Sequence, residues 1–283
     1  MLPPLPEIDR TAIFLDFDGT LVDFASTPDA VFVPSDIKFL LRQLSTALDG
    51  ALALVTGRSL ASLDSLLGEH TLCAAGCHGG EWRTVIRTND IPGNTVTAQE
   101  GNDVSEVSGI SEVSGQGNSA VETGAVDSDG IALSQARAVL TAFLQKHDVQ
   151  LENKPYSLAL HFRHNPTVEK VLDDWLDTSL IKLTELRVIK GKFVREIQLL
   201  GVNKGVAVQR FMQQPPFAGR IPVYLGDDVT DEDAFAWVNK VAGMSIKVGS
   251  GPTCAIHRLD NFQAVSTWLQ QLLRQWPERA QNF

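Results

Sequence analysis

The architecture of this chain follows from one short segment, Ile13-Phe14-Leu15-Asp16-Phe17-Asp18-Gly19-Thr20-Leu21-Val22. The apolar run that begins at Ala12 and ends at Leu15 predicts a buried strand. Two aspartates follow it, and carboxylates at the C-terminal end of a strand fit the crevice where open α/β sheets bind ligands. Neighbouring carboxylates stay ionised together only beside a cation, and oxygen ligands of this kind suit Mg²⁺. The segment therefore predicts a Mg²⁺ site with a nucleophilic aspartate.

A calcium loop or an ordinary turn is the alternative interpretation, because Asp-x-Asp-Gly occurs in both. An EF-hand loop needs further oxygen ligands at alternating positions and a glutamate near its end. Here Leu21, Val22 and Phe24 follow instead, and the segment before the motif is an apolar strand. Both features disfavour a helix-loop-helix calcium site, while a plain turn stays open at this point.

Length and charge limit the class of protein. With 283 residues, of which 43% are hydrophobic, we expect one large or two modest domains with real cores. A formal net charge of −10 disfavours a nucleic-acid-binding surface. Residues 1–10 lack an apolar signal core, and no apolar run approaches membrane-spanning length. We therefore expect a cytoplasmic monomer that binds neither nucleic acid nor membrane.

The chain has three cysteines, Cys73, Cys77 and Cys254. An odd number in a chain without an export signal predicts free thiols. Zinc is an alternative for Cys73 and Cys77, because His78 is adjacent. It is disfavoured because no second Cys or His pair has the spacing of zinc ligands.

Strand and helix patterns alternate in the first part of the chain. After the first strand, an apolar helix face begins near Ser35, and a buried strand at 51–55 ends in Thr56-Gly57-Arg58. A helix at 60–67 and a strand at 72–75 follow. This alternation predicts a doubly wound, parallel, Rossmann-like sheet of the α/β class.

The composition changes sharply at 98–130. No Lys or Arg occurs between Arg87 and Arg137, and Ser-Glu-Val-Ser-Gly appears twice, at Ser105 and at Ser111. Such a segment buries too little apolar surface to offset the entropy of ordering, so we expect a flexible insertion. A repeat-bearing binding segment is the alternative.

A second, smaller α+β domain is expected at 87–197, inserted between core segments 1–86 and 198–283. After the insertion, a helix followed by two strands occurs twice, with turns expected at Lys154-Pro155 and Lys190-Gly191. Period-two alternation puts Leu158 and Leu160 on one face and polar residues on the other. The polar positions that share a face within their segments are His161 with Arg163, Glu152 with Lys154, and Lys192 with Glu196. A polar-substrate surface and a merely solvated sheet face both fit this pattern.

The last third returns to the first pattern. Lys204 opens a helix, and a strand at 221–225 ends in Gly226-Asp227-Asp228-Val229-Thr230-Asp231-Glu232. In a parallel sheet these groups lie at the same edge as Asp16, Asp18 and Thr56. Each motif alone is weak, but clustered acids at one edge again require a cation.

Taken in order, these motifs resemble the haloacid dehalogenase superfamily of aspartate-nucleophile phosphotransferases, across nearly the whole chain outside 98–130. Within it, the chain is similar to the bacterial type of the trehalose-6-phosphate phosphatase family. The narrower resemblance rests on three segments: Gly76 to Glu81, Leu151 to Lys154 with Ala159 to Arg163, and Gly191 to Glu196. Leu199-Leu200 departs from the family, which often has a basic residue and proline there, and the insertion is long for a cap.

The resemblance implies a haloacid dehalogenase core with an inserted cap domain, and the last step of trehalose biosynthesis. In that chemistry Asp16 is the nucleophile, Asp18 is the acid and base, and Lys204 supplies positive charge. Phosphate would contact Thr56, Gly57 and Lys204. Mg²⁺ would be held by Asp16, by Asp18 through its backbone carbonyl, and by Asp227, with Asp228 or Asp231 in support. The residues implied to contact substrate are Arg58, His78, Glu152, Lys154, Lys192 and Glu196.

Other functions fit parts of the pattern. A related phosphatase would act on sucrose 6-phosphate or a monosaccharide phosphate. A phosphomutase would pass the phosphoryl group from the same aspartate to a second hydroxyl. A catalytically silent sugar-phosphate-binding module is disfavoured, because Asp16, Asp18 and Lys204 are all present.

Overall fold

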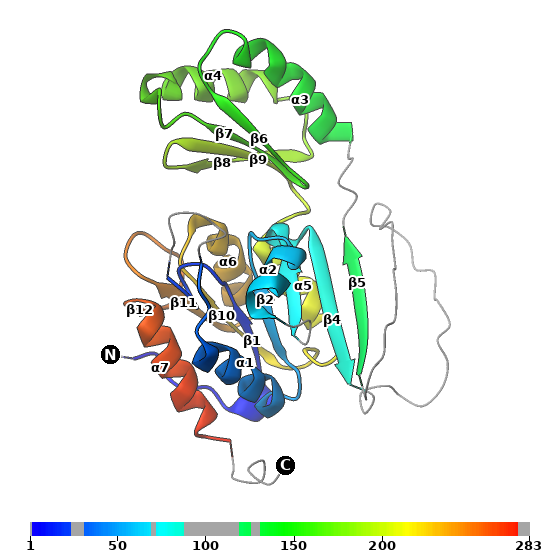
Figure 1. Ribbon diagram of the computed structural model, residues 1–283, viewed down its shortest axis with the longest axis vertical. Helices are drawn as coiled ribbons and strands as arrows, with labels where there is room; N and C mark the ends of the chain where they lie inside the picture. The colour runs from blue at the N-terminus through cyan, green and yellow to red at the C-terminus, as the bar shows by residue number, and fades with distance from the viewer. Residues whose placement is uncertain (1, 24–30, 69–71, 88–118, 126–130, 277–283) are drawn as a thin grey trace. The chain divides into compact units, whose positions relative to one another are not determined.

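The computed structural model describes the chain except for residues 1, 24–30, 69–71, 88–118, 126–130 and 277–283 (Figure 1). It divides into two compact units. Unit 1 comprises Met1–Ala125 and Asn203–Phe283, and unit 2 comprises Val126–Val202. Within the described ranges, every helix is too short or too polar to span a membrane.

Unit 1 is built on an eight-stranded sheet with the order β12-β11-β10-β1-β2-β3-β4-β5. Strands β12 to β3 of this order run parallel, and β4 and β5 are antiparallel to their neighbours. Strand β1 lies inside the sheet between β10 and β2, and all five of its residues are buried. Burial on both faces explains why its sequence is an unbroken apolar run. The strands are β1 Thr11–Leu15, β2 Leu52–Val55, β3 Cys73–Gly76, β4 Glu81–Arg87, β5 Ser119–Ala125, β10 Ile221–Gly226, β11 Met244–Val248 and β12 His257–Leu259.

The helices of unit 1 are held by apolar packing and, in some of them, by side-chain caps at the N-terminus. Helix α1 buries Leu40, Leu41 and Leu44 and packs against α7, while α5 packs against α6. The side chain of Ser59 caps α2, which begins just after the Thr56–Arg58 motif, and the side chain of Asn203 caps α5, whose first residue is Lys204. The helices are α1 Ser35–Ala47, α2 Leu60–Leu67, α5 Lys204–Met212, α6 Glu232–Lys240 and α7 Phe262–Leu273, with 3-10 turns η1 Ile8–Arg10, η3 Cys77–Gly79 and η6 Val229–Asp231.

Unit 2 is an antiparallel sheet with the order β6-β7-β9-β8 and two helices on its apolar face. Leu158, Leu160 and Ile197 pack there against Leu140 of α3 and Leu172 of α4. Its elements are α3 Ile131–Leu144, β6 Gln150–Lys154, β7 Ser157–His161, η5 Pro166–Val168, α4 Glu169–Ser179, β8 Leu186–Gly191 and β9 Val194–Leu199. The α+β pattern expected from the sequence is therefore present.

The boundaries of the two units differ from the predicted ones at 86/87 and 197/198. The observed division falls after Ala125 and before Asn203. Strand β5, which lies in the predicted insertion 98–130, pairs along its whole length with β4 in the core sheet. Its mixed sequence of mostly small residues does not predict a strand, because pairing with a neighbour rather than local composition holds it. Residues 98–118 and 126–130 of that insertion lie outside the described residues.

Both hairpin turns of unit 2 lie further along the chain than predicted. Gly191 pairs with Val194, so the β8–β9 turn consists of Lys192 and Phe193 rather than Lys190-Gly191. Likewise, Lys154 pairs with Ser157 across the β6–β7 turn. The sequence pattern predicted that Lys192 and Glu196 share one face of the sheet. That prediction is wrong, because Lys192 lies in the turn and not in a strand.

Candidate active site

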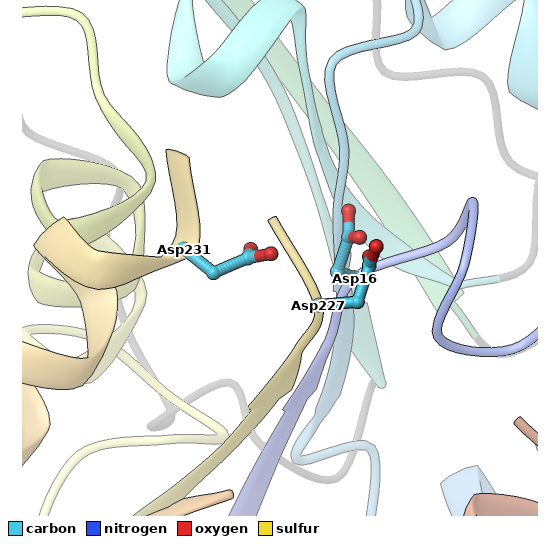
Figure 2. Close-up of side chains that lie close together, drawn as sticks. All are labelled: Asp16, Asp227 and Asp231. Carbon is cyan, nitrogen blue, oxygen red and sulfur yellow. The ribbon is translucent and has the colours of Figure 1, made fainter. Parts of the chain in front are cut away.

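Three carboxylates meet at the C-terminal edge of the core sheet. Asp16 follows β1, Asp227 follows β10, and Asp231 ends η6. One ligand atom of each lies within 4.8 Å of the others. Figure 2 shows the carboxylates of Asp16 and Asp227 next to each other and that of Asp231 pointing toward them. The parallel pairing of Leu15 with Leu225 explains the arrangement, because β1 and β10 end within one residue of each other at the same sheet edge.

Lys204 joins two of these carboxylates. It is the first residue of α5, and its Nζ donates to Asp16 Oδ1 at 2.8 Å and to Asp231 Oδ1 at 2.7 Å. The Tyr224 hydroxyl also donates to Asp231 Oδ1, at 2.7 Å. The Thr20 hydroxyl lies 3.4 Å from Asp16 Oδ2 and 3.2 Å from Asp227 Oδ1. Lys204, Asp16 and Asp231 are each at most 4% exposed, so water does little to screen these charges.

Charge in this cluster is not balanced. Burial raises the pKa of Asp16 well above its ordinary value, and repulsion from Asp231 adds to the effect. Burial also raises the pKa of Asp227. Burial alone would lower the pKa of Lys204, but attraction to Asp16 and Asp231 prevails and raises it. Three carboxylates face the ammonium groups of Lys204 and of Lys247, which donates to the Asp227 carbonyl, so negative charge is still in excess. Carboxylate oxygens are the donors that a hard divalent cation prefers, so these residues fit a metal ion.

Asp18 points to a different partner. Its Oδ2 accepts from Arg58 Nε at 2.6 Å, and its Oδ1 accepts from Arg58 NH2 at 2.7 Å. This bidentate pair is a strong, directional contact. The Arg58 amide donates to the buried Thr56 hydroxyl oxygen at 3.1 Å. Thus the Thr56–Arg58 motif is tied to the first motif, and the Asp18 carboxylate lies outside the three-carboxylate cluster.

His78 lies in a turn with unusual backbone geometry. Cys77 and His78 have φ values of 49° and 58°. A Cβ at Gly57 would lie only 2.7 Å from the His78 ring, so any larger residue there would displace that ring. Glu81 accepts a hydrogen bond from Leu60 N at 3.0 Å and another from the Cys77 thiol at 3.2 Å. The amides of Cys77 and His78 donate to the carbonyls of Arg58 and Thr56 at 2.8 and 2.9 Å, and these bonds hold the turn against the Thr56–Arg58 motif.

Asp228 acts here as a helix cap. Its Oδ1 accepts from Val229 N at 2.6 Å, and its own amide donates to Asp231 Oδ2 at 2.9 Å. A metal role for Asp228, like that for Asp18, therefore stays a prediction. The sequence motifs gave no role to Thr20, Tyr224 or Lys247, which donates to the Asp227 carbonyl, and they offered Asp231 only as an alternative to Asp228. The capping-box spacing from Asp228 to Asp231 was a usable signal for Asp231.

The polar face of the unit 2 sheet carries most of the other predicted residues. Glu152, Ala159 and Glu196 are register partners on three adjacent strands, so they share this face. Glu196 Oε1 accepts from the Ser157 hydroxyl at 2.6 Å and lies 3.7 Å from Lys154 Nζ. In the same sheet, His161 Nε2 lies 2.8 Å from Glu152 Oε2. The exposed Lys192 lies apart from this group in the β8–β9 turn.

The three cysteines are free, as predicted. Cys73 accepts a hydrogen bond from Val85 N, and burial raises the pKa of Cys254 to about 11. In the part of the chain that the structure describes, the group with metal-ligand spacing contains aspartates and no cysteine. The zinc alternative therefore finds no support there.

Comparison with known proteins identifies the family. The family model described as trehalose-phosphatase matches residues 14–264. This chain belongs to the trehalose-phosphatase family. The trehalose-6-phosphate phosphatase of Escherichia coli (strain K12) is 36% identical over 282 residues, which cover 99% of this chain and 94% of that protein. The predicted family is thereby confirmed.

Solved structures confirm the fold class predicted for this trehalose-phosphatase family member. The C. albicans trehalose-6-phosphate phosphatase C-terminal domain matches with a TM-score of 0.68 at 21% identity, covering 94% of this chain and 93% of that chain. A haloacid dehalogenase-like hydrolase from B. subtilis matches with a TM-score of 0.57 at 12% identity, covering 92% and 99%. At these identities the likeness establishes the fold alone.

Proposed function

We propose that this chain is a Mg²⁺-dependent phosphatase that hydrolyses trehalose 6-phosphate to trehalose and inorganic phosphate. The observation that carries the proposal is the buried Asp16–Lys204–Asp231 cluster with Asp227 beside it, in a chain that matches the trehalose-phosphatase family along its length. The E. coli relative carries the name of this activity. An excess of buried carboxylate charge is what an aspartate nucleophile with a cation would require.

Asp16 is the proposed nucleophile. One of its oxygens attacks phosphorus, the bond from phosphorus to the sugar oxygen breaks, and an aspartyl-phosphate forms on Asp16. Lys204 donates to Asp16 Oδ1, whereas the contact of Asp16 Oδ2 with the Thr20 hydroxyl is long, at 3.4 Å. Oδ2 is therefore the less strongly bound oxygen. Asp16, the Asp18 carbonyl and Asp227, with Asp228 or Asp231 in support, would hold Mg²⁺. When bound, the ion would offset the repulsion between the carboxylate and the phosphate.

Asp18 is the proposed acid and base. It gives its proton to the departing sugar oxygen, then takes a proton from the water that attacks the phosphorus of the aspartyl-phosphate. That attack breaks the bond between phosphorus and Asp16 and releases phosphate. In this structure both Asp18 oxygens accept from Arg58, and the proposed contact of Arg58 with the sugar phosphate would free one of them to carry the proton. Thr56, Gly57 and Lys204 are proposed to bind the phosphoryl oxygens.

Substrate selection is proposed to depend on polar contacts. A disaccharide offers many hydroxyls and little apolar surface, so a partner that is missing leaves a polar group unpaired. On the unit 2 sheet, Glu196 already has a fixed orientation through Ser157 and Lys154. The residues proposed to contact the sugar phosphate are Arg58, His78, Glu152, Lys154, Lys192 and Glu196. The cytoplasmic location and monomeric state stay predictions from the sequence.

The experiment is inorganic phosphate release from trehalose 6-phosphate, glucose 6-phosphate and sucrose 6-phosphate, with Mg²⁺ and with chelator. Strong release from trehalose 6-phosphate alone, lost with chelator, is expected. Equal activity across the panel would retain the aspartate chemistry and refute the substrate. Conversion to an isomeric sugar phosphate without phosphate release would indicate a mutase.

A further inference from the structure

Arg195 occupies a position where unit 2 otherwise buries apolar side chains. On the β7–β9–β8 register it pairs with Leu160 and Lys190, next to the pairs that Ile197 makes with Leu158 and Val188. Its side chain is only 3% exposed. A charged group on the core face of a sheet needs partners for all of its polar atoms.

The guanidinium of Arg195 satisfies that need from two directions. Toward α4, its Nε donates to Asp173 Oδ1 at 2.6 Å, and its NH2 donates to Glu169 Oε1 at 2.6 Å and to Asp173 Oδ2 at 3.1 Å. Toward the hairpin, its NH1 donates to the carbonyls of Gly191 and Val194, both at 3.0 Å. The group also lies 5.2 Å above the Phe162 ring. One side chain thus connects helix α4 with the ends of strands β8 and β9 that flank the turn.

The two carbonyls flank the β8–β9 turn. Between them lie Lys192 and Phe193, and Phe193 has a φ of 61°, a region that residues with a Cβ rarely adopt. Such strain persists only where surrounding contacts hold the backbone. Here those contacts are the NH1 bonds of Arg195 and a bond from Phe162 N to the Phe193 carbonyl at 3.0 Å.

Stability is a weak reason to keep a buried ion cluster, because apolar replacements of such clusters are often neutral or stabilising. Geometry is a better reason, since a planar guanidinium fixes several partners at once. We propose that Arg195 is a positioning residue of the phosphatase: it holds the β8–β9 turn in the conformation that presents Lys192 to the sugar phosphate. The inference rests on the proposed function, which gives Lys192 its contact.

The test is a double-mutant cycle of Arg195→Met and Lys192→Ala, measured with trehalose 6-phosphate and with an aryl phosphate. Arg195→Met is expected to raise KM for trehalose 6-phosphate about tenfold and to leave kcat/KM for the aryl phosphate within about twofold. Added to Lys192→Ala, it is expected to change KM by less than about twofold, because it acts through Lys192. An equal effect in both backgrounds would overturn the proposal.

Controls separate positioning from general damage. Lys170→Met removes an exposed charge on α4 that pairs with Asp174 and does not contact Arg195, so KM should be unchanged. Should Arg195→Met fail to fold, Arg195→Lys keeps the charge but not the planar fork, and the same rise in KM is expected. An Arg195→Lys enzyme with wild-type KM would contradict the proposal.

A measurement without substrate keeps this test distinct from that of the proposed function. Hydrogen exchange at 190–194 should be faster in the Arg195 variant than in the wild type, with 150–161 unchanged. Absence of phosphate release from trehalose 6-phosphate by the wild type would refute the proposed function. Unchanged exchange at 190–194 would refute the hold of Arg195 on the turn in either case.

Discussion

Two buried cations in this protein, Lys204 and Arg195, lie in clusters that differ in charge balance. Lys204 in unit 1 and Arg195 in unit 2 each contact two carboxylates at 2.6–2.8 Å. Around Lys204 a third carboxylate, Asp227, is close, and burial raises the pKa of Asp16. Around Arg195 a second cation, Lys190, lies 3.1 Å from one carboxylate, and hydrogen bonding lowers the pKa of that acid.

The difference lies in how charge is balanced and solvated. Glu169 and Asp173 beside Arg195 remain 49% and 21% exposed, so water and two cations stabilise their anionic forms. Asp231 beside Lys204 is fully buried. A buried group of like charges that its protein neighbours do not neutralise marks a site for a ligand, whereas a balanced group marks a scaffold.

Removal of the proposed nucleophile should have the largest effect on the Lys204 cluster. Asp16→Asn is expected to lower kcat for trehalose 6-phosphate by a factor on the order of 10⁴ or more. It should also raise the Tm of the metal-free protein, because the ionised Asp16 is penalised by burial and repulsion. Phosphate release and thermal unfolding in chelator measure both. Retained activity would reassign the nucleophile, and a lower Tm would contradict the charge argument.

The polar face of unit 2 should affect substrate choice rather than chemistry. Glu196→Ala is expected to lower kcat/KM for trehalose 6-phosphate about 10²-fold and to spare slow hydrolysis of an aryl phosphate. Ser157→Ala removes only the 2.6 Å hydrogen bond that orients Glu196, so a smaller change in the same direction is expected. Steady-state kinetics on both substrates measure it. Equal losses on the two substrates would remove Glu196 from the sugar-contacting set.

Cation binding should sharpen the contrast between the two clusters. At a Mg²⁺ concentration about 100 times Kd, Tm should rise by roughly 5–10 °C, because only the folded protein has the site. Asp227→Asn should abolish this rise. Asp228→Asn, which removes only a cap of η6 in this arrangement, should preserve it. A rise that survives in Asp227→Asn but not in Asp228→Asn would exchange the roles of these two acids.

The smallest effect concerns acid stability. Asp173 has a pKa lowered below its usual 3.8, first by the hydrogen bond from Arg195, so its contribution to folding is present above that value. It is lost as pH falls through the lower folded pKa. The Tm difference between wild type and Asp173→Asn should therefore be largest near neutral pH and shrink below about pH 3.8. Asp174→Asn, at an exposed i,i+4 pair, is the control. A difference independent of pH would show that charge plays no part.

Much of the fold was predictable because the parallel strands β1, β2, β3 and β10 are almost wholly buried runs. The predicted helix at 60–67 matches α2, and the strand at 221–225 matches β10 except at its last residue. Strand β5 was not predictable, since its small and mixed residues show no clear alternation and pairing with β4 holds it. Strand β12 is three residues long, too short for a periodicity to register.

The site was predictable to the level of its motifs but not of its atoms. Asp16, Asp227 and Lys204 converge as expected, because parallel strands end at one edge. Which of Asp228 and Asp231 turns inward depends on the 3-10 turn η6, for which the capping-box spacing is a signal but hydrophobic periodicity is not. In the same way, a shift of the β8–β9 turn moved Lys192 off the sheet.

The position of β1 between β10 and β2 also affects how the chain folds during its synthesis on the ribosome. One of the two edges of β1 pairs with β10, so it stays unpaired until residues 221–225 have been synthesised, about two hundred residues after β1. Unit 2, in contrast, is one continuous segment that is complete at Val202. During synthesis, unit 2 can therefore fold first, while strand β1 of unit 1 still has one unpaired edge. Nascent chains halted before β10 are expected to be the form most in need of chaperones.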